Sequence, residues 1–518
     1  MNVITASQAA ELIPDGVTVA GTGFGGIQQP EYIMVAIEEA FARDGHPSGL
    51  TYVHSAGQSD LHGGGLDHLA HEGLLHRVIG GHFRQAVNLG RMILDNRLEA
   101  YNFPQGVIAL LYREIAAKRP GLITHAGLGT FVDPRLEGGK MNERTTQDLV
   151  QVVALAGREW LFYSSLPIDV ALVRMTAADP HGNLVDSREA CRMESLPLTM
   201  AAHNSGGIVI AQVEEVLDRP LRPMEVSVPG IYVDYVVVAP PEHHRQTTDY
   251  QFNPLFVGME SAEAPEIPIL PLDERKVIAR RAAMELFDGA VVNLGIGMPE
   301  GVASVAYEEG VFDRLNLTVE SGTIGGVPAG GLSFGATANP IATIAHDSQF
   351  DFYSGGGLDL TFLGLAEFDA AGNVNVSRFG KIVAGCGGFI EISQNAHEVV
   401  FCGTLTASGL AVEVVEARLN IAQEGKLPKA REHVQQVTFS GAEALRRGVP
   451  VKYVTERCVF ALRPEGVALV EVAPGVEIER DILAQMEFAP IVAPDVRPMS
   501  AALFGGERMG LQLRAAAH

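Results

Sequence analysis

One glutamate in the sequence combines a chemically useful side chain with a distinctive setting. Glu320 ends the apolar segment LNLTV (315–319), which is typical of a buried strand, and precedes the glycine-rich run SGTIGGVPAGGLSFG (321–335). A carboxylate at the end of a buried strand, facing a glycine-rich loop, can meet a ligand at exposed backbone. It can also act as a nucleophile that divides an acyl transfer into easier steps. By position alone, a glutamate at a strand end is more often a surface or capping residue, so this hypothesis needs other residues.

Two glycine-rich turns could serve the same chemistry. The segment VNLGIGMP (292–299) follows an apolar run, and GCGGF (385–389) follows GKIVA. Turns of this composition expose backbone N–H groups, which can bind a phosphate or a developing oxyanion. Most glycine-rich turns are only turns, so each segment alone is a weak indication.

A third glycine-rich segment, GTGFGG (21–26), matches the G-x-G-x-x-G pattern of dinucleotide-binding folds. Such folds place an acidic residue at a strand end about 20 residues later. Here only Glu38 and Glu39 in a predicted helix and Asp44 near a turn follow, and the next strand carries no acid. We therefore do not expect a nicotinamide dinucleotide site.

Two further groups could suggest other chemistry. His62, His68, His71 and His76 lie close together in the sequence, but no H-E-x-x-H pattern is present, and partly exposed helical histidines explain them better than a metal site. Cys386 could be proposed as a nucleophile, but no histidine base can be assigned to it, so it is interpreted as a small filler residue. We expect no metal site.

The elements that would position Glu320 follow an α/β pattern. Residues 17–21 and 51–55 read as buried strands, and residues 30–45 as the helix between them. Similar apolar runs alternate with helical stretches along the rest of the chain. This alternation predicts open, mostly parallel α/β sheets, whose ligands bind at the carboxyl ends of the strands.

An internal repeat indicates two related α/β halves. Residues 15–19 resemble 288–292, and each segment leads into a glycine-rich turn followed by Pro-Glu. Residues 50–57 align with 317–322, so that His54 of the first half stands where the second half has Glu320. Four positions also recur at constant spacing: Asp169, Asp179, Gly182 and Asn183 correspond to Asp359, Asp369, Gly372 and Asn373.

The boundary between the halves should lie in a segment rich in proline and polar residues. We predict a first half over 1–225, a linker region over 226–272 and a second half over 273–518 that carries Glu320. Pro-rich connectors such as EAPEIPILPLDE (263–274) are common between domains.

Composition limits the partners and the compartment. The formal net charge of −24 would repel a nucleic acid or an anionic membrane, and no run of 18 apolar residues predicts a membrane span. The four cysteines, Cys191, Cys386, Cys402 and Cys458, form no C-x-x-C pair, and the N-terminal residues do not resemble a signal peptide. We expect reduced thiols and a cytoplasmic protein.

The combination of motifs is more specific than its parts. NLGIGMP, VESGTIGGVPAGG and GCGGF occur in this order, and the first half adds EAYNFPQGVIALLYREIAAKRPG and LGTFVDPRLEGGK. Together they make the chain resemble the family I CoA-transferases over most of its length. The match is to the acetate and propionate branch, in which two subunits are fused in one chain. The loop at Glu320 reads E-S-G-T-I-G-G and not the S-E-N-G of the β-ketoacid enzymes, which weakens an expectation of succinyl-CoA as the donor.

The resemblance implies roles for individual residues. Glu320 matches the catalytic glutamate, which forms an acyl anhydride and then a glutamyl-CoA thioester, and Gln105 matches an active-site glutamine. Gly57 and Gln58 match a loop whose backbone faces the thioester carbonyl. The remaining matches line the CoA site or supply oxyanion donors: Asn293, Gly295, Gly297, Met298, Pro299, Gly385, Gly387, Gly388 and Phe389.

The expected activity is transfer of CoA from a short-chain acyl-CoA to a free carboxylate, such as acetate or propionate, with ping-pong kinetics. Thioester is exchanged for thioester, so no cofactor beyond CoA itself is expected. The resemblance also implies a homotetramer or homodimer. Two alternatives stay open: an acyl-CoA hydrolase on the same scaffold, and a CoA-binding subunit of a lyase-type complex.

Overall fold

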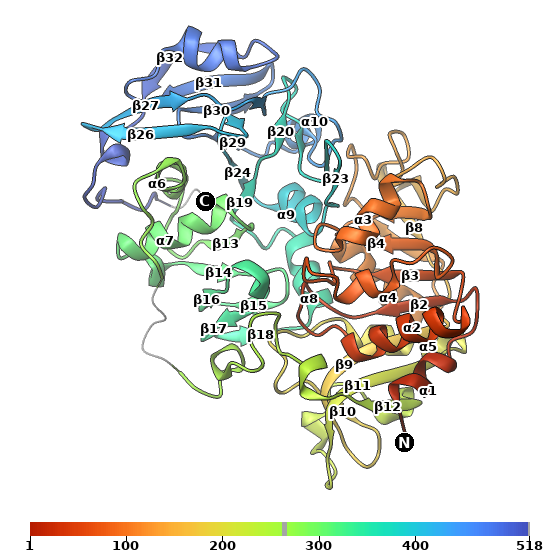
Figure 1. Ribbon diagram of the computed structural model, residues 1–518. Helices are drawn as coiled ribbons and strands as arrows, with labels where there is room; N and C mark the ends of the chain where they lie inside the picture. The colour runs from red at the N-terminus through yellow and green to blue at the C-terminus, as the bar shows by residue number, and fades with distance from the viewer. Residues whose placement is uncertain (262–266, 516–518) are drawn as a thin grey trace. The chain divides into compact units, whose positions relative to one another are not determined.

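Short runs rich in valine, isoleucine and alanine form the central strands, because such residues suit a sheet that is covered on both faces. The computed structural model describes residues 1–261 and 267–515. These residues form two compact units, whose elements are labelled in Figure 1. The first unit holds residues 1–261, 319–351 and 380–388, and the second holds 267–318, 352–379 and 389–515.

The first unit is built on a mainly parallel sheet. Its strands are β1 (Asn2–Ile4), β2 (Thr18–Gly21), β3 (Leu50–His54), β4 (Leu75–Gly80), β5 (Glu99–Asn102), β9 (Val170–Ala178), β10 (Leu184–Val185), β11 (Ile208–Val216) and β12 (Tyr235–Val238). Their order is β1-β12-β11-β9-β2-β3-β4-β5, with β10 beside β9. All pairs are parallel except β10 with β9. Every residue of β9 is buried, so both faces of the sheet are covered there.

Helices connect these strands. They are α1 (Ala6–Glu11), α2 (Glu31–Asp44), α3 (Val87–Leu94), α4 (Gln105–Ala116) and α5 (Ser195–Ser205). Helix α2 ends at Gly45, which adopts φ +71° and donates its N–H to Phe41 O, as glycine does at many helix ends. Helices α4 and α5 pack against each other, and α5 packs on β9 and β11.

Smaller elements complete the first unit. An antiparallel sheet has the order β6-β8-β7, with β6 at Gly121–Thr124, β7 at Val150–Leu155 and β8 at Arg158–Ser164. Residues 319–351 and 380–388 contribute β15 (Thr323–Ile324), β16 (Val327–Pro328), β17 (Thr337–Ala338), β18 (Ala342–Thr343), the start of α8 (His346–Ser354) and β23 (Ile382–Val383). Pairing is antiparallel between β15 and β18 and between β16 and β17.

The second unit has its own sheet. Its strands are β13 (Val291–Leu294), β14 (Asn316–Thr318), β19 (Leu360–Gly364), β24 (Glu398–Cys402), β29 (Val451–Val454), β30 (Cys458–Arg463), β31 (Gly466–Val472) and β32 (Ile491–Pro498). They follow the order β14-β13-β19-β24-β29-β30-β31-β32. Pairing is parallel from β14 to β29, antiparallel through β30 and β31, and parallel again at β32.

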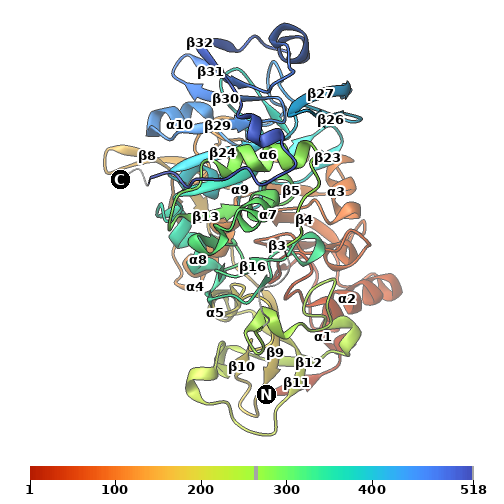
Figure 2. The same ribbon diagram turned by 90° about the vertical axis from the view of Figure 1, so that its left-hand side faces the viewer.

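The helices of the second unit pack around this sheet. They are α6 (Glu274–Ala283), α7 (Gly301–Glu308), α9 (Phe389–Asn395) and α10 (Gly441–Arg447). Helices α6 and α7 pack against each other and share a core with β13, β19 and β24. Short strands are β20 (Glu367–Phe368), β21 (Val374–Asn375), β22 (Arg378–Phe379), β25 (Thr406–Ala407), β26 (Ala411–Val415), β27 (Arg418–Gln423) and β28 (Leu427–Pro428). The β26–β27 hairpin lies at the same end of this unit as β30–β32 (Figures 1 and 2).

The predicted repeat has equivalent hydrogen bonds in both units. Asp169 Oδ2 accepts the N–H of Thr18 at 2.8 Å, and Asp359 Oδ2 accepts the N–H of Val291 at 2.8 Å. The Asp-x-x-Gly-Asn turns repeat as well. Asp179 Oδ1 and Oδ2 accept the N–H and Nδ2 of Asn183, and the corresponding atoms of Asp369 accept those of Asn373.

The predicted fold class, two related and mostly parallel α/β domains, is confirmed. The limits of the predicted halves and linker stay a prediction, because the compact units do not coincide with the repeated halves of the sequence. The first unit includes residues 319–351 and 380–388, which belong to the predicted second half. Residues 262–266 of that linker lie outside the described residues. Among the described residues, no helix is long and apolar enough to cross a membrane.

Candidate active site

Glu320 lies in a tight turn directly after β14. The N–H of Gly322 donates to Val319 O at 3.0 Å, and the N–H of Val319 donates to Thr323 O at 3.0 Å. Gly322 has φ +106°, and a Cβ at this position would lie 2.1 Å from Ile344 O. Only glycine fits there, so the backbone that carries Glu320 is closely determined.

The neighbours of Glu320 are buried, and Glu320 itself is half-buried. Ser321 is 0% exposed and donates its hydroxyl to Gly335 O at 2.6 Å. Val319 belongs to an apolar cluster with Phe24, Ala56 and Phe334. This cluster places the Glu320 turn in the same packed region as the loop that begins at Ala56.

The GCGG turn is held by Asn102 at the end of β5. Asn102 Oδ1 accepts the N–H of Cys386 at 2.9 Å, and its Nδ2 donates to Gly80 O and Gly81 O at 2.8 and 2.7 Å. The N–H of Gly387 also donates to Gly81 O, at 2.7 Å. Two N–H groups of the turn are therefore used to fix the turn itself.

Gln105 connects this turn to α8. It is the first residue of α4 and only 3% exposed, and its backbone N–H donates to Gly387 O at 2.9 Å. Its Nε2 lies 2.8 Å from His346 Nε2. The structure thus brings the predicted residues Gln105, Gly385, Gly387 and Gly388 together.

His82 was not identified from the sequence, and three of the predicted glycines lie against it. A Cβ on Gly57 would lie 3.0 Å from His82 Nδ1, one on Gly385 would lie 3.0 Å from His82 Cα, and one on Gly387 would lie 3.7 Å from His82 Cδ2. Burial lowers the pKa of His82 to about 4, so this imidazole is neutral near pH 7. It can offer a hydrogen bond to a ligand but no charge.

The Gly57–Gln58 loop is anchored through the side chain of Gln58. Tyr52 donates its hydroxyl to Gln58 Oε1 at 3.0 Å, and Gln58 Nε2 donates to Gly21 O at 2.8 Å. The N–H of Gly25 donates to Gly57 O at 2.6 Å. Because the Gln58 side chain is used internally, only the backbone of this loop is suited to contact a ligand.

The predicted residues 293–299 belong to the second unit. Asn293 is a buried residue of β13, and Thr361 donates its hydroxyl to Asn293 Oδ1 at 3.3 Å. The following loop turns through Gly297, at φ +87°, whose carbonyl accepts Arg275 Nη2 at 2.8 Å. Ile296 is 57% exposed, so the backbone of this loop is accessible.

The other predicted positions of the second unit are Gly295, Met298, Pro299 and Phe389, and they differ in how they pack. Gly295 packs closely, since a Cβ there would lie 3.3 Å from Leu363 Cδ2. Met298 and Pro299 open a short 3₁₀ helix, Met298–Glu300. Phe389 is 9% exposed and stacks on Phe401 with ring centroids 5.8 Å apart. The Phe389 side chain is thus a core group, and only its backbone is suited to serve a ligand.

The competing motifs have internal explanations. A Cβ on Gly21 would lie 2.0 Å from Tyr52 Oη, and one on Gly26 would lie 1.8 Å from Thr248 Oγ1, so these glycines are required by packing within the unit. His68 Nε2 lies 2.9 Å from Glu31 Oε1, and its Nδ1 lies 2.6 Å from Glu38 Oε2. These contacts place His68 in a carboxylate-bound cluster.

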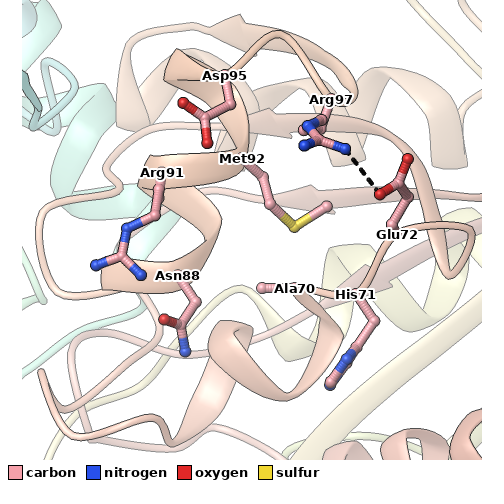
Figure 3. A pocket seen from close by; sticks show the side chains of 8 residues that line it. All are labelled: Ala70, His71, Glu72, Asn88, Arg91, Met92, Asp95 and Arg97. Atoms are coloured by element: carbon pink, nitrogen blue, oxygen red, sulfur yellow. Dashed lines mark hydrogen bonds and ion pairs between the residues drawn. The ribbon is translucent and has the colours of Figure 1, made fainter.

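A surface groove of about 330 Å³ in the first unit contains none of the predicted residues (Figure 3). Its lining residues are Ala70, His71, Glu72, Asn88, Arg91, Met92, Asp95 and Arg97. Across it, Arg97 Nη1 donates to Glu72 Oε2 at 2.9 Å. The groove therefore gives no support to a binding site other than the one around Glu320.

Comparison with known proteins agrees with the residue pattern. A family model described as coenzyme A transferase matches residues 3–239. The chain is 46% identical to a caffeate CoA-transferase of Acetobacterium woodii over 515 residues, which covers 98% of each chain. The chain belongs to the coenzyme A transferase family. It is also 41% identical to the acetate CoA-transferase YdiF of Escherichia coli K12, over 100% of this chain and 97% of YdiF.

A solved structure resembles the transferase over nearly its whole length. YdiF from Escherichia coli O157:H7, in a thioester complex with CoA, gives a TM-score of 0.94 at 39% identity and covers 99% of this chain and 98% of that chain. The predicted family and enzyme class, a CoA-transferase, are confirmed. The roles of individual residues stay a prediction.

The residues missed from the sequence share one signal. Asn102 is the last residue of β5, and His82 follows β4 by two positions. Both are polar residues at the carboxyl end of a parallel strand, as Glu320 is. Applying that rule to every strand would have identified them. No comparable local signal marks His346, which lies against Gln105.

Proposed function

We propose that this CoA-transferase moves coenzyme A between short-chain carboxylic acids through a thioester on Glu320. The observation that carries the proposal is the turn of Glu320, a half-buried carboxylate on a backbone fixed by Gly322 and Ser321. The thioester complex of the related YdiF supports a covalent intermediate. Such a turn can present a nucleophile without reorganisation during the reaction.

The first step forms an anhydride. A Glu320 carboxylate oxygen attacks the carbonyl carbon of the acyl-CoA, and the carbonyl oxygen becomes an oxyanion. Collapse of this intermediate breaks the C–S bond, and CoA leaves as the thiolate with the electron pair. Because the N–H groups of Cys386 and Gly387 already donate within the protein, we propose the N–H of Gly388 as the oxyanion donor from this turn.

The second step forms the thioester. The CoA thiolate attacks the glutamyl carbonyl of the anhydride, and the first acid leaves as its carboxylate. A second carboxylate then attacks the Glu320 thioester, and the same steps run in reverse. The proposed CoA contacts of the second unit are Asn293, Gly295, Gly297, Met298, Pro299 and Phe389.

Mass spectrometry of the protein after incubation with acetyl-CoA alone tests the proposal. We expect a CoA adduct on the peptide that contains Glu320, loss of the adduct in Glu320→Gln, and an unchanged adduct in Glu39→Gln, an exposed glutamate of α2. An adduct on another residue, or exchange activity that survives in Glu320→Gln, would contradict the assignment. Steady release of free CoA without added acid would favour the hydrolase, and absence of any adduct would favour a CoA-binding subunit.

The acceptor acid is proposed to be acetate or propionate. The relatives are named for acetate and for caffeate, so a panel of acetate, propionate and caffeate at equal concentration distinguishes a small from an aromatic acceptor pocket. One methylene changes discrimination by only about 1–3 kcal/mol, so the ranking within short acids should be shallow.

The remaining expectations are also proposals. The four cysteines are buried and form no disulfide with one another, which supports a reducing, cytoplasmic location. A homotetramer or homodimer and the absence of a cofactor other than CoA stay predictions. Light scattering and activity of the metal-free, dialysed protein would test them.

A further inference from the structure

A buried carboxylate–imidazole pair lies behind Gln105. Glu194 and His346 are both 0% exposed, and Glu194 Oε2 lies 2.7 Å from His346 Nδ1. Ser55 donates its hydroxyl to the other oxygen, Glu194 Oε1. On its far side, His346 Nε2 lies 2.8 Å from Gln105 Nε2. A continuous chain of contacts therefore runs from Ser55 to the GCGG turn, because the Gln105 N–H donates to Gly387 O.

Three helices begin at these residues. Gln105 is the first residue of α4, His346 the first of α8, and Glu194 immediately precedes α5. The backbone also ties two of them together, since the N–H of His346 donates to Arg192 O at 2.8 Å. The three side chains are thus fixed at the ends of rigid elements.

Burial of the Glu194 carboxylate and the His346 ring costs desolvation free energy, which opposes folding. Burial raises the pKa of the Glu194 carboxyl, but its contact with the His346 ring and the hydrogen bond from the Ser55 hydroxyl outweigh burial and lower it. Glu194 is therefore an ionised carboxylate without solvent. Replacement of such a pair by apolar groups is often neutral or stabilising, so its presence suggests a role beyond stability.

The contacts of His346 determine its tautomer. A carboxylate only accepts hydrogen bonds, so the Nδ1 that faces Glu194 carries a proton. The neighbour of Nε2 is the amide nitrogen of Gln105, which only donates. In this arrangement Nε2 accepts the bond, which corresponds to the Nδ1–H tautomer of His346.

The same contact with His346 accompanies one orientation of the Gln105 amide. Gln105 Nε2 faces His346, so Gln105 Oε1 points away from His346. A Cβ on Gly387 would lie 3.7 Å from Gln105 Oε1. A second proton on His346 would convert its Nε2 into a donor and reverse the amide. We propose that Glu194 and His346 are positioning residues that hold the Gln105 amide with its carbonyl oxygen toward the GCGG turn. This inference rests on the proposed function, in which that turn contacts the reacting thioester.

Other charged or titratable groups face the pair. They are Asp347 and Arg113 on the α8 and α4 side, and His54, Tyr112 and Cys191 on the side of Glu194. Burial raises the pKa of Asp347, and it lowers the pKa of His54 to about 4. The His54 imidazole is therefore neutral near pH 7, and Glu194 is the carboxylate in contact with the His346 ring.

Nitrogen chemical shifts test the tautomer without reference to activity. In ¹⁵N-histidine-labelled protein, the signals missing from His346→Gln identify the ring. We expect a protonated Nδ1 and an unprotonated Nε2 at pH 7. A doubly protonated ring, or the Nε2–H tautomer, would overturn the proposed amide orientation.

A double-mutant cycle tests the positioning role. Gln105→Ala should lower kcat by about 100-fold, as loss of one preorganised group does in other sites. His346→Gln should lower kcat by about 10-fold with an unchanged KM for acyl-CoA, and should have almost no further effect in the Gln105→Ala background. Equal losses in both backgrounds would show a purely structural role and overturn the proposal.

A matched control separates stability from positioning. His244 is also a buried histidine beside a buried glutamate, with His244 Nε2 3.5 Å from Glu189 Oε1, but it does not contact Gln105. His244→Gln should show no coupling to Gln105→Ala. If His346→Gln does not fold, Ser55→Ala replaces it. Its effect on kcat should be smaller and should likewise disappear in the Gln105→Ala background. Formation of the Glu320 adduct by the wild-type protein is scored separately, so failure of the proposed function is distinguishable from failure of this inference.

Discussion

Asn102 Oδ1 accepts the backbone N–H of Cys386 at 2.9 Å, across 284 residues of sequence. The same side chain donates to the carbonyls of Gly80 and Gly81. One amide therefore joins the end of β4 to the GCGG turn, and the shape of that turn depends on it.

Asn102→Ala should both destabilise the protein and slow thioester formation. Loss of the side chain removes the acceptor that holds the Cys386 N–H, and loss of such a buried hydrogen bond costs about 1–3 kcal/mol. We expect a lower urea midpoint and a rate of CoA-adduct formation reduced at least 10-fold. Asn316→Ala is the control, since the side chain of this exposed residue donates from Nδ2 to Gly289 O at 2.8 Å. An Asn102→Ala protein with wild-type rates would show that the turn does not depend on this amide.

Gly385→Ala should disturb the same turn by a different route. Gly385 has φ +82°, and its Cβ would lie 2.8 Å from Gly81 O, so the backbone must shift. Gly45 at the end of α2 also has a positive φ, +71°, but has open space around it. Gly45→Ala should therefore cost only about 1–2 kcal/mol of left-handed strain with normal activity. We expect Gly385→Ala to cost more and to lower kcat, measured by urea unfolding and an exchange assay. Equal behaviour of the two variants would contradict the crowding argument.

His68 should make stability depend on pH. Burial lowers its pKa, but Glu31 and Glu38 outweigh burial and raise it to about 9. Since the folded-state pKa lies above the unfolded value of about 6.5, protonated His68 contributes its full stability below that value and loses it as pH rises through 9.

The test compares wild type with His68→Gln at pH 6, 8 and 10. The difference in the free energy of unfolding should be about 1–3 kcal/mol at pH 6 and should nearly vanish at pH 10. The exposed pair of His46 and Asp15 is the control, and His46→Gln should leave the free energy of unfolding nearly unchanged at the three pH values. A His68→Gln difference that is constant with pH would refute the ion-pair account.

Local patterns predicted much of the fold and part of the site. Strand β14 and the glycines after it indicated Glu320, because a buried run followed by a tight turn leaves a signal in the sequence. The repeated aspartates Asp169 and Asp359 were visible for the same reason. Glu194 and His346 are 152 residues apart, and their pairing has no periodic signal. Which N–H groups of the GCGG turn are already used also depends on long-range contacts to Asn102 and Gly81.

Glu320→Asp tests whether the position of the carboxylate matters as well as its charge. Val319 is buried, Ser321 is bonded to Gly335 O, and Gly322 admits no Cβ, so the backbone cannot move to compensate for a side chain one methylene shorter. A displacement of about 1 Å can cost roughly 100-fold in rate. We therefore expect kcat to fall by at least about 100-fold, while the urea midpoint stays close to that of wild type because Glu320 is only half-buried. Rapid-quench measurement of the CoA adduct gives the rate of the covalent step directly. A variant that forms the adduct at the wild-type rate would mean that the turn does not fix the nucleophile.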